Sequence, residues 1–275
     1  MNEFSFINEN NTRFSLRDFS QKAFIPSVSG LGYKNNLTFV KVGNLYKTDN
    51  KEIAQGTLSG TAIFSSYEHY RDFVNYVESS ESLRLIYKPI DVEYFRDVEF
   101  GGVPSPTKKG GLVEAEISLL CKGLYYTQTD TRFTIEEVTG QSQYDLLFDY
   151  TFNDYASVNV VFDNVGHADA QMVVEFYGYF VNPKIELIQN DVVIRSVDFN
   201  ITVEVGEKLI YSAQDGQNYV VLDNGISQVN AVSSLSLNSD NFFQIPKGTS
   251  KIVCSSDGGT FTKIVFRILT SYKGV

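Results

Sequence analysis

Tryptophan is absent from this 275-residue sequence, and cysteine and histidine occur only twice each. Two cysteines in a chain of this length do not make a disulfide framework, and Cys121 and Cys254 both lie in apolar runs typical of buried, reduced thiols. His69 and His167 have no partners at metal-ligand spacing, so a zinc site is not expected. We therefore predict no metal and no cofactor.

Clusters of basic residues are also missing. The chain has 23 Lys and Arg against 33 Asp and Glu, a formal net charge of -10. Stable binding to nucleic acid or to an anionic membrane surface needs clustered cations, so we expect neither partner. No apolar run is long enough to span a bilayer, and the first residues, MNEFSFINENNTRF, do not resemble a signal peptide. We expect a soluble protein made in the cytoplasm.

Phenylalanine and tyrosine are abundant, with 21 and 17 copies. Together with Val and Ile they form short alternating segments such as LTFVKV, TLSGTAIF and LVEAEISLLCK, which are typical of strands. Turn signals separate these segments, among them SGLGYKNN, KTDNK and GGVPSPTKKGG. The pattern predicts a mainly β chain with two domains. We place the boundary in the polar stretch near residue 130, which gives domains 1–130 and 131–275.

One segment, SSYEHYRDFVNYVESS, has helical periodicity and predicts a helix over residues 66–80. Ser65 and Glu68 have the spacing of a capping box. Apolar residues follow at three- and four-residue intervals and predict one buried stripe, made of Tyr67, Tyr70, Phe73, Val74 and Val77. We expect this helix to flank the N-terminal β-domain.

A group of acids in IDVEYFRDVEF raises the possibility of a glycan-degrading enzyme, with Asp91 and Glu93 as the two carboxylates. The favoured interpretation is a strand whose acids face water while Val92, Tyr94, Val98 and Phe100 face the core. The nucleophile motif G-x-S-x-G and phosphate-binding glycine motifs are absent. We therefore predict that the protein is not an enzyme.

The many tyrosines leave a second alternative open, a carbohydrate-binding β-sandwich module of the adhesin type. Flat aromatic rings can stack on sugars. Most tyrosines here, however, alternate with apolar residues, as in VEFYGYF, which is more typical of core and rim positions. A glycan site is therefore the weaker interpretation.

The order of elements resembles a known family. A β-rich start precedes the helix with YRDFVNYV; then come LRLIYKP, YFRDVEFGGV, a Lys/Gly hairpin, LVEAEISLLCKGLYYT and a second β-region with GYFVNPKIELI, ITVEVGEKLIYSA and FQIPKGTSKIVC. This order is similar to that of the distal tail proteins of siphophages, bacteriophages with long non-contractile tails. The resemblance implies an N-terminal β-domain with one flanking α-helix and a C-terminal galectin-like β-sandwich.

The resemblance also implies a place and partners. Distal tail proteins form a homohexameric ring in the virion, at the distal end of the tail, and join the tail tube to the tail tip or baseplate. The implied partners are the tail tube protein, the tail-associated tip protein, the tape-measure protein and a receptor-binding protein. No catalytic residue is carried over. Our candidate subunit contact is the tip of the Lys/Gly hairpin, formed by Lys108, Lys109, Gly110 and Gly111.

Overall fold

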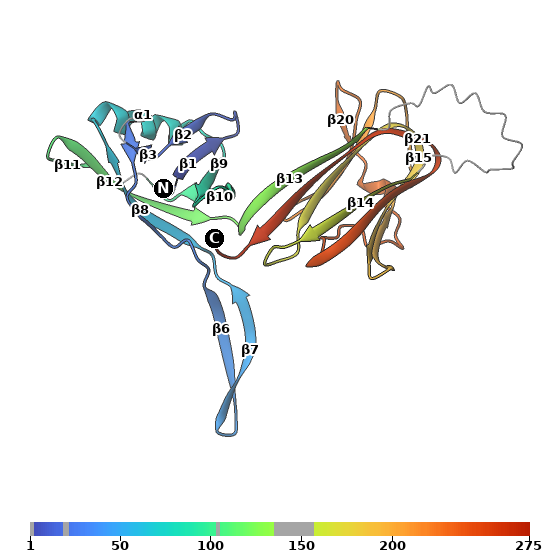
Figure 1. Ribbon diagram of the computed structural model, residues 1–275, viewed down its shortest axis with the longest axis horizontal. Helices are drawn as coiled ribbons and strands as arrows, with labels where there is room; N and C mark the ends of the chain where they lie inside the picture. The colour runs from blue at the N-terminus through green and yellow to red at the C-terminus, as the bar shows by residue number, and fades with distance from the viewer. Residues whose placement is uncertain (1–2, 19–21, 103–104, 135–156) are drawn as a thin grey trace, which may run out of the picture. The chain divides into compact units, whose positions relative to one another are not determined.

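The structure, a computed structural model, describes residues 3–18, 22–102, 105–134 and 157–275. It confirms a mainly β chain with one α-helix among these residues (Figure 1). The chain divides into two compact units: unit 1 comprises Met1–Thr127 and Tyr272–Val275, and unit 2 comprises Gln128–Ser271. The sequence placed the boundary near residue 130 and assigned residues 272–275 to the second domain, whereas the structure groups these four residues with the first unit. The segment 135–156, for which further strands were expected, lies outside the described residues.

Unit 1 is built on an antiparallel sheet. The described strands of unit 1 are β1 (Glu3–Asn8), β2 (Arg13–Ser15), β3 (Arg17–Asp18), β4 (Ala23–Phe24), β5 (Val28–Ser29), β6 (Asn35–Val42), β7 (Leu45–Ile53), β8 (Thr57–Phe64), β9 (Leu83–Lys88), β10 (Tyr94–Phe100), β11 (Thr107–Lys109) and β12 (Leu112–Cys121). The main pairings run in the order β8, β12, β10, β9, β1 and β2. The short strands β4 and β5 pair with the free edge of β8. Among the described strands, β6 and β7 pair only with each other.

The alternation of apolar and polar residues in the sequence sets which face of this sheet is buried. In β12, Val113, Ala115 and Ile117 point into the core, while Glu116 and Ser118 between and beside them are exposed. Side chains of one strand alternate between the two faces, so one apolar series covers one face of the sheet. The core of unit 1 collects on that face.

Helix α1 (Tyr67–Glu78) packs on this core with Tyr70, Phe73 and Val77. The predicted helix is confirmed, but its N-terminus differs from the expected capping box. Ser66, not Ser65, is the N-cap, and its hydroxyl accepts a hydrogen bond from the His69 amide at 3.3 Å.

Two further details of the helix differ from the prediction. The hydroxyl of Ser65 instead hydrogen-bonds the imidazole Nδ1 of His69 at 2.6 Å. Tyr67, predicted to be buried, is 62% exposed because it lies at the first helical residue, ahead of the turn that covers the core. The buried stripe therefore begins at Tyr70.

Unit 2 contains the remaining strands and one short 3₁₀ helix. They are β13 (Tyr125–Thr134), which begins in unit 1, then β14 (Ser157–Asn164), β15 (Gln171–Gln189), β16 (Val192–Asp198), β17 (Thr202–Val203), β18 (Lys208–Gln214), β19 (Gln217–Asp223), β20 (Gln228–Asn230), η2 (Val232–Ser234) and β21 (Gly248–Tyr272). The long strands β15 and β21 pair along nearly their whole length. The first half of β15 also pairs with β18, and the second half with β16. Each long strand thus contributes to two sheets, which enclose one apolar core.

Glycines allow the two long strands of unit 2 to bend past each other. The register shifts between Tyr177 and Gly178, and Gly178 has φ +120°. A Cβ at Gly259, where φ is +73°, would lie 2.2 Å from the carbonyl oxygen of Tyr179. Only glycine tolerates both this backbone conformation and this approach. The bend therefore depends on residue type at these positions.

Candidate assembly surface

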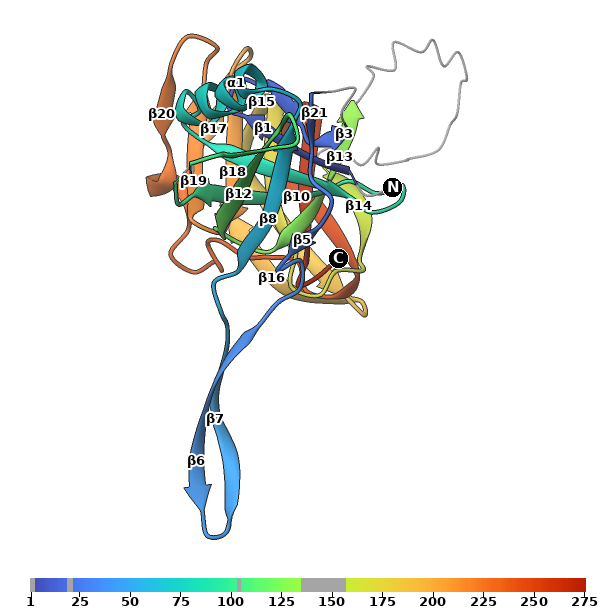
Figure 2. The same ribbon diagram turned by 90° about the vertical axis from the view of Figure 1, so that its left-hand side faces the viewer.

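Strands β6 and β7 form a hairpin that projects from unit 1, as Figures 1 and 2 both show. We call residues 34–54 the arm. Its base is closed by a 2.8 Å hydrogen bond from the Ala54 amide to the Lys34 carbonyl oxygen. Its tip is the two-residue turn Gly43–Asn44, between the paired residues Val42 and Leu45. Gly43 has φ +64°, which suits glycine at the first central position of a hairpin turn.

The sequence did not predict the arm correctly. The segment KTDNK was expected to be a turn, but it lies within β7. Thr38 pairs with Asn50 and Phe39 with Thr48, so Asp49 is the extra residue of a β-bulge. Asn and Asp are common in turns, and here a bulge accommodates them while the turn forms at Gly43–Asn44.

The arm exposes apolar side chains on both faces. Register and alternation place Phe39 and Tyr46 on one face, and Val42 and Leu45 on the other. Phe39 is 54% exposed and Leu45 76% exposed. A two-stranded hairpin alone is only marginally stable in water. A contiguous apolar surface on a soluble protein usually marks an interaction site, so the arm is a candidate for one.

The charge of the arm is opposite to that of the chain. Lys34, Lys41, Lys47 and Lys51 outnumber Asp49 and Glu52, which gives +2. Because the whole chain has a formal charge of -10, the remainder carries -12. An acidic surface would therefore attract the arm and orient it.

The candidate contact Lys108–Gly111 forms the tip of the hairpin between β11 and β12. Lys109 pairs with Leu112 across a two-residue turn, and Gly110 and Gly111 have φ values of +58° and +87°. Lys109 is exposed, and its ammonium lies 3.9 Å from Glu114 of the same chain. Its role in subunit contact stays a prediction.

The carboxylates considered for catalysis do not form a facing pair on a strand. Asp91 and Glu93 both precede β10, and Asp91 is exposed. Glu93 Oε1 lies 3.6 Å from Arg13 Nη1. Val92, expected to face the core, is 50% exposed because regular pairing begins only at Tyr94. The expectation that Val92 faces the core was therefore wrong, whereas Asp91 is exposed as expected.

From Tyr94 onward the strand follows the predicted alternation of buried and exposed residues. This alternation also buries Arg96, which the sequence pattern did not single out. The buried positions of β10 are Val98, which is fully buried, and Arg96, which is 4% exposed. The acids on the other face, Asp97 and Glu99, pair with Arg84 and Lys122 at 3.1 and 2.5 Å. Alternation alone would place Arg96 on the buried face, because it lies two residues from Tyr94 and from Val98, but its charge argued against that position.

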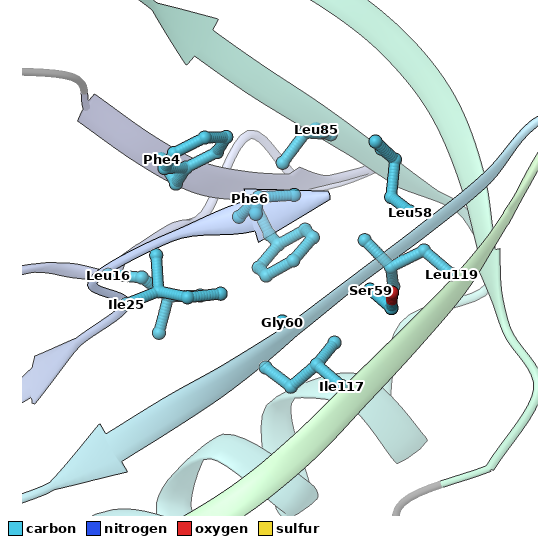
Figure 3. A pocket seen from close by; sticks show the side chains of 11 residues that line it. Phe4, Phe6, Leu16, Ile25, Leu58, Ser59, Gly60, Leu85, Ile117 and Leu119 are labelled. Atoms are coloured by element: carbon cyan, nitrogen blue, oxygen red, sulfur yellow. The ribbon is translucent and has the colours of Figure 1, made fainter. Parts of the chain in front are cut away.

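Figure 3 shows a small cavity inside unit 1, which side chains from β1, β8, β9 and β12 surround. Its volume is about 20 Å³, and its walls are almost entirely apolar, with Phe4, Phe6 and Leu58 among them. An apolar space of this size holds at most one water and offers it no hydrogen-bond partners. We interpret it as a packing gap without chemistry.

The ranges that the structure covers contain neither a candidate metal cluster nor a helix that could span a membrane. No group of three or more His, Cys, Asp or Glu side chains there could hold a metal ion. None of the helices in these ranges has the length and apolar character needed to cross a bilayer. Cys121 and Cys254 are both buried and free, as predicted.

The comparisons with known proteins agree with the family resemblance. The family described as "Distal tail protein, N-terminal domain" matches residues 3–122, which confirms the predicted resemblance. A chain in the structure of the phage P2 baseplate in its activated conformation with Ca is similar over 100% of both chains, with 13% identity and a TM-score of 0.69. The SPP1 Dit (gp 19.1) protein, described as a paradigm of the hub adsorption apparatus in phages infecting Gram-positive bacteria, is similar over 96% of this chain and 98% of its own. Its identity is 14% and its TM-score 0.61. No curated protein matches this chain in sequence.

Proposed function

Because residues 3–122 belong to the N-terminal domain family of distal tail proteins, we propose that this chain is a structural hub protein of a phage tail. In this proposal six copies form a ring at the distal end of the tail. Unit 1 forms the ring, and unit 2, which we propose to be a galectin-like sandwich, lies in the outer part. The number of copies comes from the family resemblance.

The observation that carries the proposal is the arm. It has apolar residues on both faces, strands that pair only with each other, and a positive charge in an acidic protein. A head-to-tail contact between identical copies uses two different patches and closes into a ring when the rotation permits. The arm supplies one patch, and an acidic part of the next copy supplies the other.

The partners of the ring follow from its position in the tail. We propose contacts with the tail tube protein and the tape-measure protein on one side, and with the tail-associated tip protein on the other. A receptor-binding protein would attach to unit 2. The acidic charge of the chain supports a ring that lets DNA pass without retaining it, since stable DNA binding needs clustered cations.

The two alternatives have less support. A glycan-degrading enzyme needs facing carboxylates, and Asp91 and Glu93 do not provide them. A carbohydrate-binding adhesin would use the shallow cleft of unit 2 lined by Tyr179, Lys208 and Asp223. Lys208 lies 3.6 Å from Asp223 and 3.8 Å from Glu175, so its charge is compensated within the protein. We therefore retain the structural role.

The proposal is tested by electron microscopy of virions, or of tail tips reconstituted from this chain and its partner proteins. We expect density for a closed ring of six copies at the distal end of the tube. A deletion of residues 35–53, with the base joined by a short glycine linker, should remove the ring while both units still fold. A tail without this protein, or with the protein in an open or non-cyclic arrangement, would contradict the proposal.

A further inference from the structure

A cleft at the root of the arm contains a buried arginine. The cleft has a volume of about 440 Å³. Its walls are Ile53 at the end of β7, residues 54–56, which link β7 to β8, residues 121–124, and Arg96 of β10. All of them belong to unit 1. Arg96 is only 4% exposed.

The guanidinium of Arg96 has few partners. Its Nε donates a 2.9 Å hydrogen bond to the Gly123 carbonyl oxygen, and its Cζ lies 4.6 Å from the centre of the Tyr125 ring. Nη1 is buried and has no well-aligned hydrogen bond to any described residue. The Tyr125 hydroxyl has no well-aligned hydrogen bond either, although it lies close enough to the guanidinium to interact with it. Within the described ranges, no carboxylate lies at ion-pair distance from Arg96. Lys122, the other cation of the cleft, is paired with Glu99.

Gly56 leaves room beside the guanidinium. A Cβ at this position would lie 2.5 Å from Arg96 Nη2 and 3.2 Å from its Cζ. Gly56 therefore lies directly beside Nη2, and both residues line the cleft. A larger residue at position 56 would displace the side chain or narrow the space in front of it.

A buried charge without a counterion is costly, and its unpaired N–H groups add to this cost. A carboxylate that enters the cleft would compensate the charge of Arg96 by Coulomb attraction, even though Nη1 itself is covered by the protein. We propose that this cleft is a carboxylate-binding site, and that an Asp or Glu side chain of the adjacent copy in the ring occupies it.

Two observations favour a second copy as the source. The cleft lies at the root of the arm, so a neighbour that binds the arm approaches the same edge of unit 1. Outside the arm the chain carries a charge of -12, so its surface offers many carboxylates. The identity of the occupant rests on the proposed ring, whereas the chemistry of the cleft does not.

The chemistry is tested on the full-length chain in dilute solution, with acetate as the probe. We expect sodium acetate to raise the melting temperature above that in sodium chloride of equal ionic strength, by about 1–2 °C near the acetate Kd. Arg96→Met should abolish this difference. Lys122→Met, which changes a cation of the same cleft that is already paired, should keep it. Equal acetate effects in wild type and Arg96→Met would overturn the site.

A second variant keeps this test decisive if Arg96→Met fails to fold. Gly56→Ala retains the charge but places a methyl group against the guanidinium. Gly56 has no positive φ, so the backbone tolerates alanine. This variant should also lose the acetate effect, and an unchanged effect would count against the cleft.

The source of the carboxylate is tested by assembly of the reconstituted tail tip. We expect folded Arg96→Met to need at least about tenfold more protein for ring formation, and Lys122→Met to assemble like wild type. Normal assembly of Arg96→Met would overturn the neighbouring copy as the source, even with a positive acetate result. Failure of the wild type to form rings would overturn the proposed function, and the acetate measurement would still decide whether the cleft binds carboxylates.

Discussion

At the scale of single residues, Phe73 joins helix α1 to the core of unit 1. Its ring is fully buried and lies 5.2 Å from Phe14 and 5.4 Å from Phe64, between ring centres. Phe73→Ala should lower the free energy of unfolding of unit 1 by roughly 3–5 kcal/mol, because it leaves a cavity among aromatic rings. Glu78→Ala, at an exposed position of the same helix, should change it by less than about 0.5 kcal/mol. Urea denaturation of both variants measures the difference, and equal losses would mean that the buried face is misassigned.

Tyr125 makes the stability of unit 1 sensitive to alkaline pH. Burial raises the pKa of its hydroxyl to about 12, although the nearby Arg96 cation acts in the opposite direction. The folded state therefore holds this proton more tightly than the unfolded state. The stabilisation is complete below pH 10 and is lost as the pH rises from 10 to about 12.

Tyr125→Phe isolates this contribution. At pH 7 the variant should be about as stable as wild type, because the buried hydroxyl that it removes makes no well-aligned hydrogen bond among the described residues. Between pH 8 and pH 11.5 it should lose roughly 1–3 kcal/mol less than wild type in urea unfolding. Parallel loss in the two proteins would show that Tyr125 does not titrate with a raised pKa.

The two thiols should be inert in the native state. Burial raises the pKa of both Cys121 and Cys254, so little thiolate is present at neutral pH. Labelling with a thiol reagent should be slow in buffer and fast in urea, with two thiols titrated per chain after unfolding. Rapid labelling of the native protein, or a disulfide in fresh preparations, would contradict this expectation.

Sequence alternation predicts individual burial well within regular strands and poorly at their ends. Val98 lies inside β10 and is buried as expected, while Val92 lies before its start and is exposed. Arg96 shows a different limit. Alternation alone places it in the core, but a charge there is normally avoided, so a pattern of apolar residues does not reveal it.

At the scale of elements, we expect changes in the arm to affect assembly but not the stability of unit 1. Its side chains contact no core, so Phe39→Ser and Val42→Ser, on opposite faces, should each change the stability of unit 1 by less than about 0.5 kcal/mol. Both should weaken ring assembly, because they remove apolar area from the proposed contact. Leu237→Ser is the control, since Leu237 is 97% exposed but lies in unit 2. Sedimentation of reconstituted tips measures assembly; a loss with Leu237→Ser as large as with the arm variants would argue against a specific role of the arm.

Helix α1 and the arm also show why some elements can be predicted and others cannot. The helix repeats its apolar residues within a single segment, so its existence follows from local spacing. The arm has apolar residues on both faces and therefore no amphipathic pattern that distinguishes an exposed hairpin from a buried one. In the proposed ring its environment is a second copy of the chain, and the pattern of residues within one copy does not reveal such a contact.

At the scale of the whole molecule, residues 272–275 belong to the first unit although the second unit precedes them in the chain. Tyr272 lies 5.3 Å from Tyr94 between ring centres, edge to face, and Val275 packs against the core of unit 1. Deleting residues 272–275 should therefore destabilise unit 1, by about 1–3 kcal/mol for the apolar area lost. Hydrogen exchange should become faster in β9 and β10 and stay unchanged in β15 and β18. Faster exchange confined to unit 2 would contradict the grouping of these residues with unit 1.

This return of the chain to unit 1 has a consequence for biosynthesis. The first 127 residues emerge from the ribosome well before residues 272–275 are made, because translation adds only about 5–20 residues per second. During that interval unit 1 lacks the packing that residues 272–275 provide, and we expect it to be less stable than when they are present. If the proposed ring forms through the arms, we expect nascent copies on one messenger RNA to join less readily before residues 272–275 have been added.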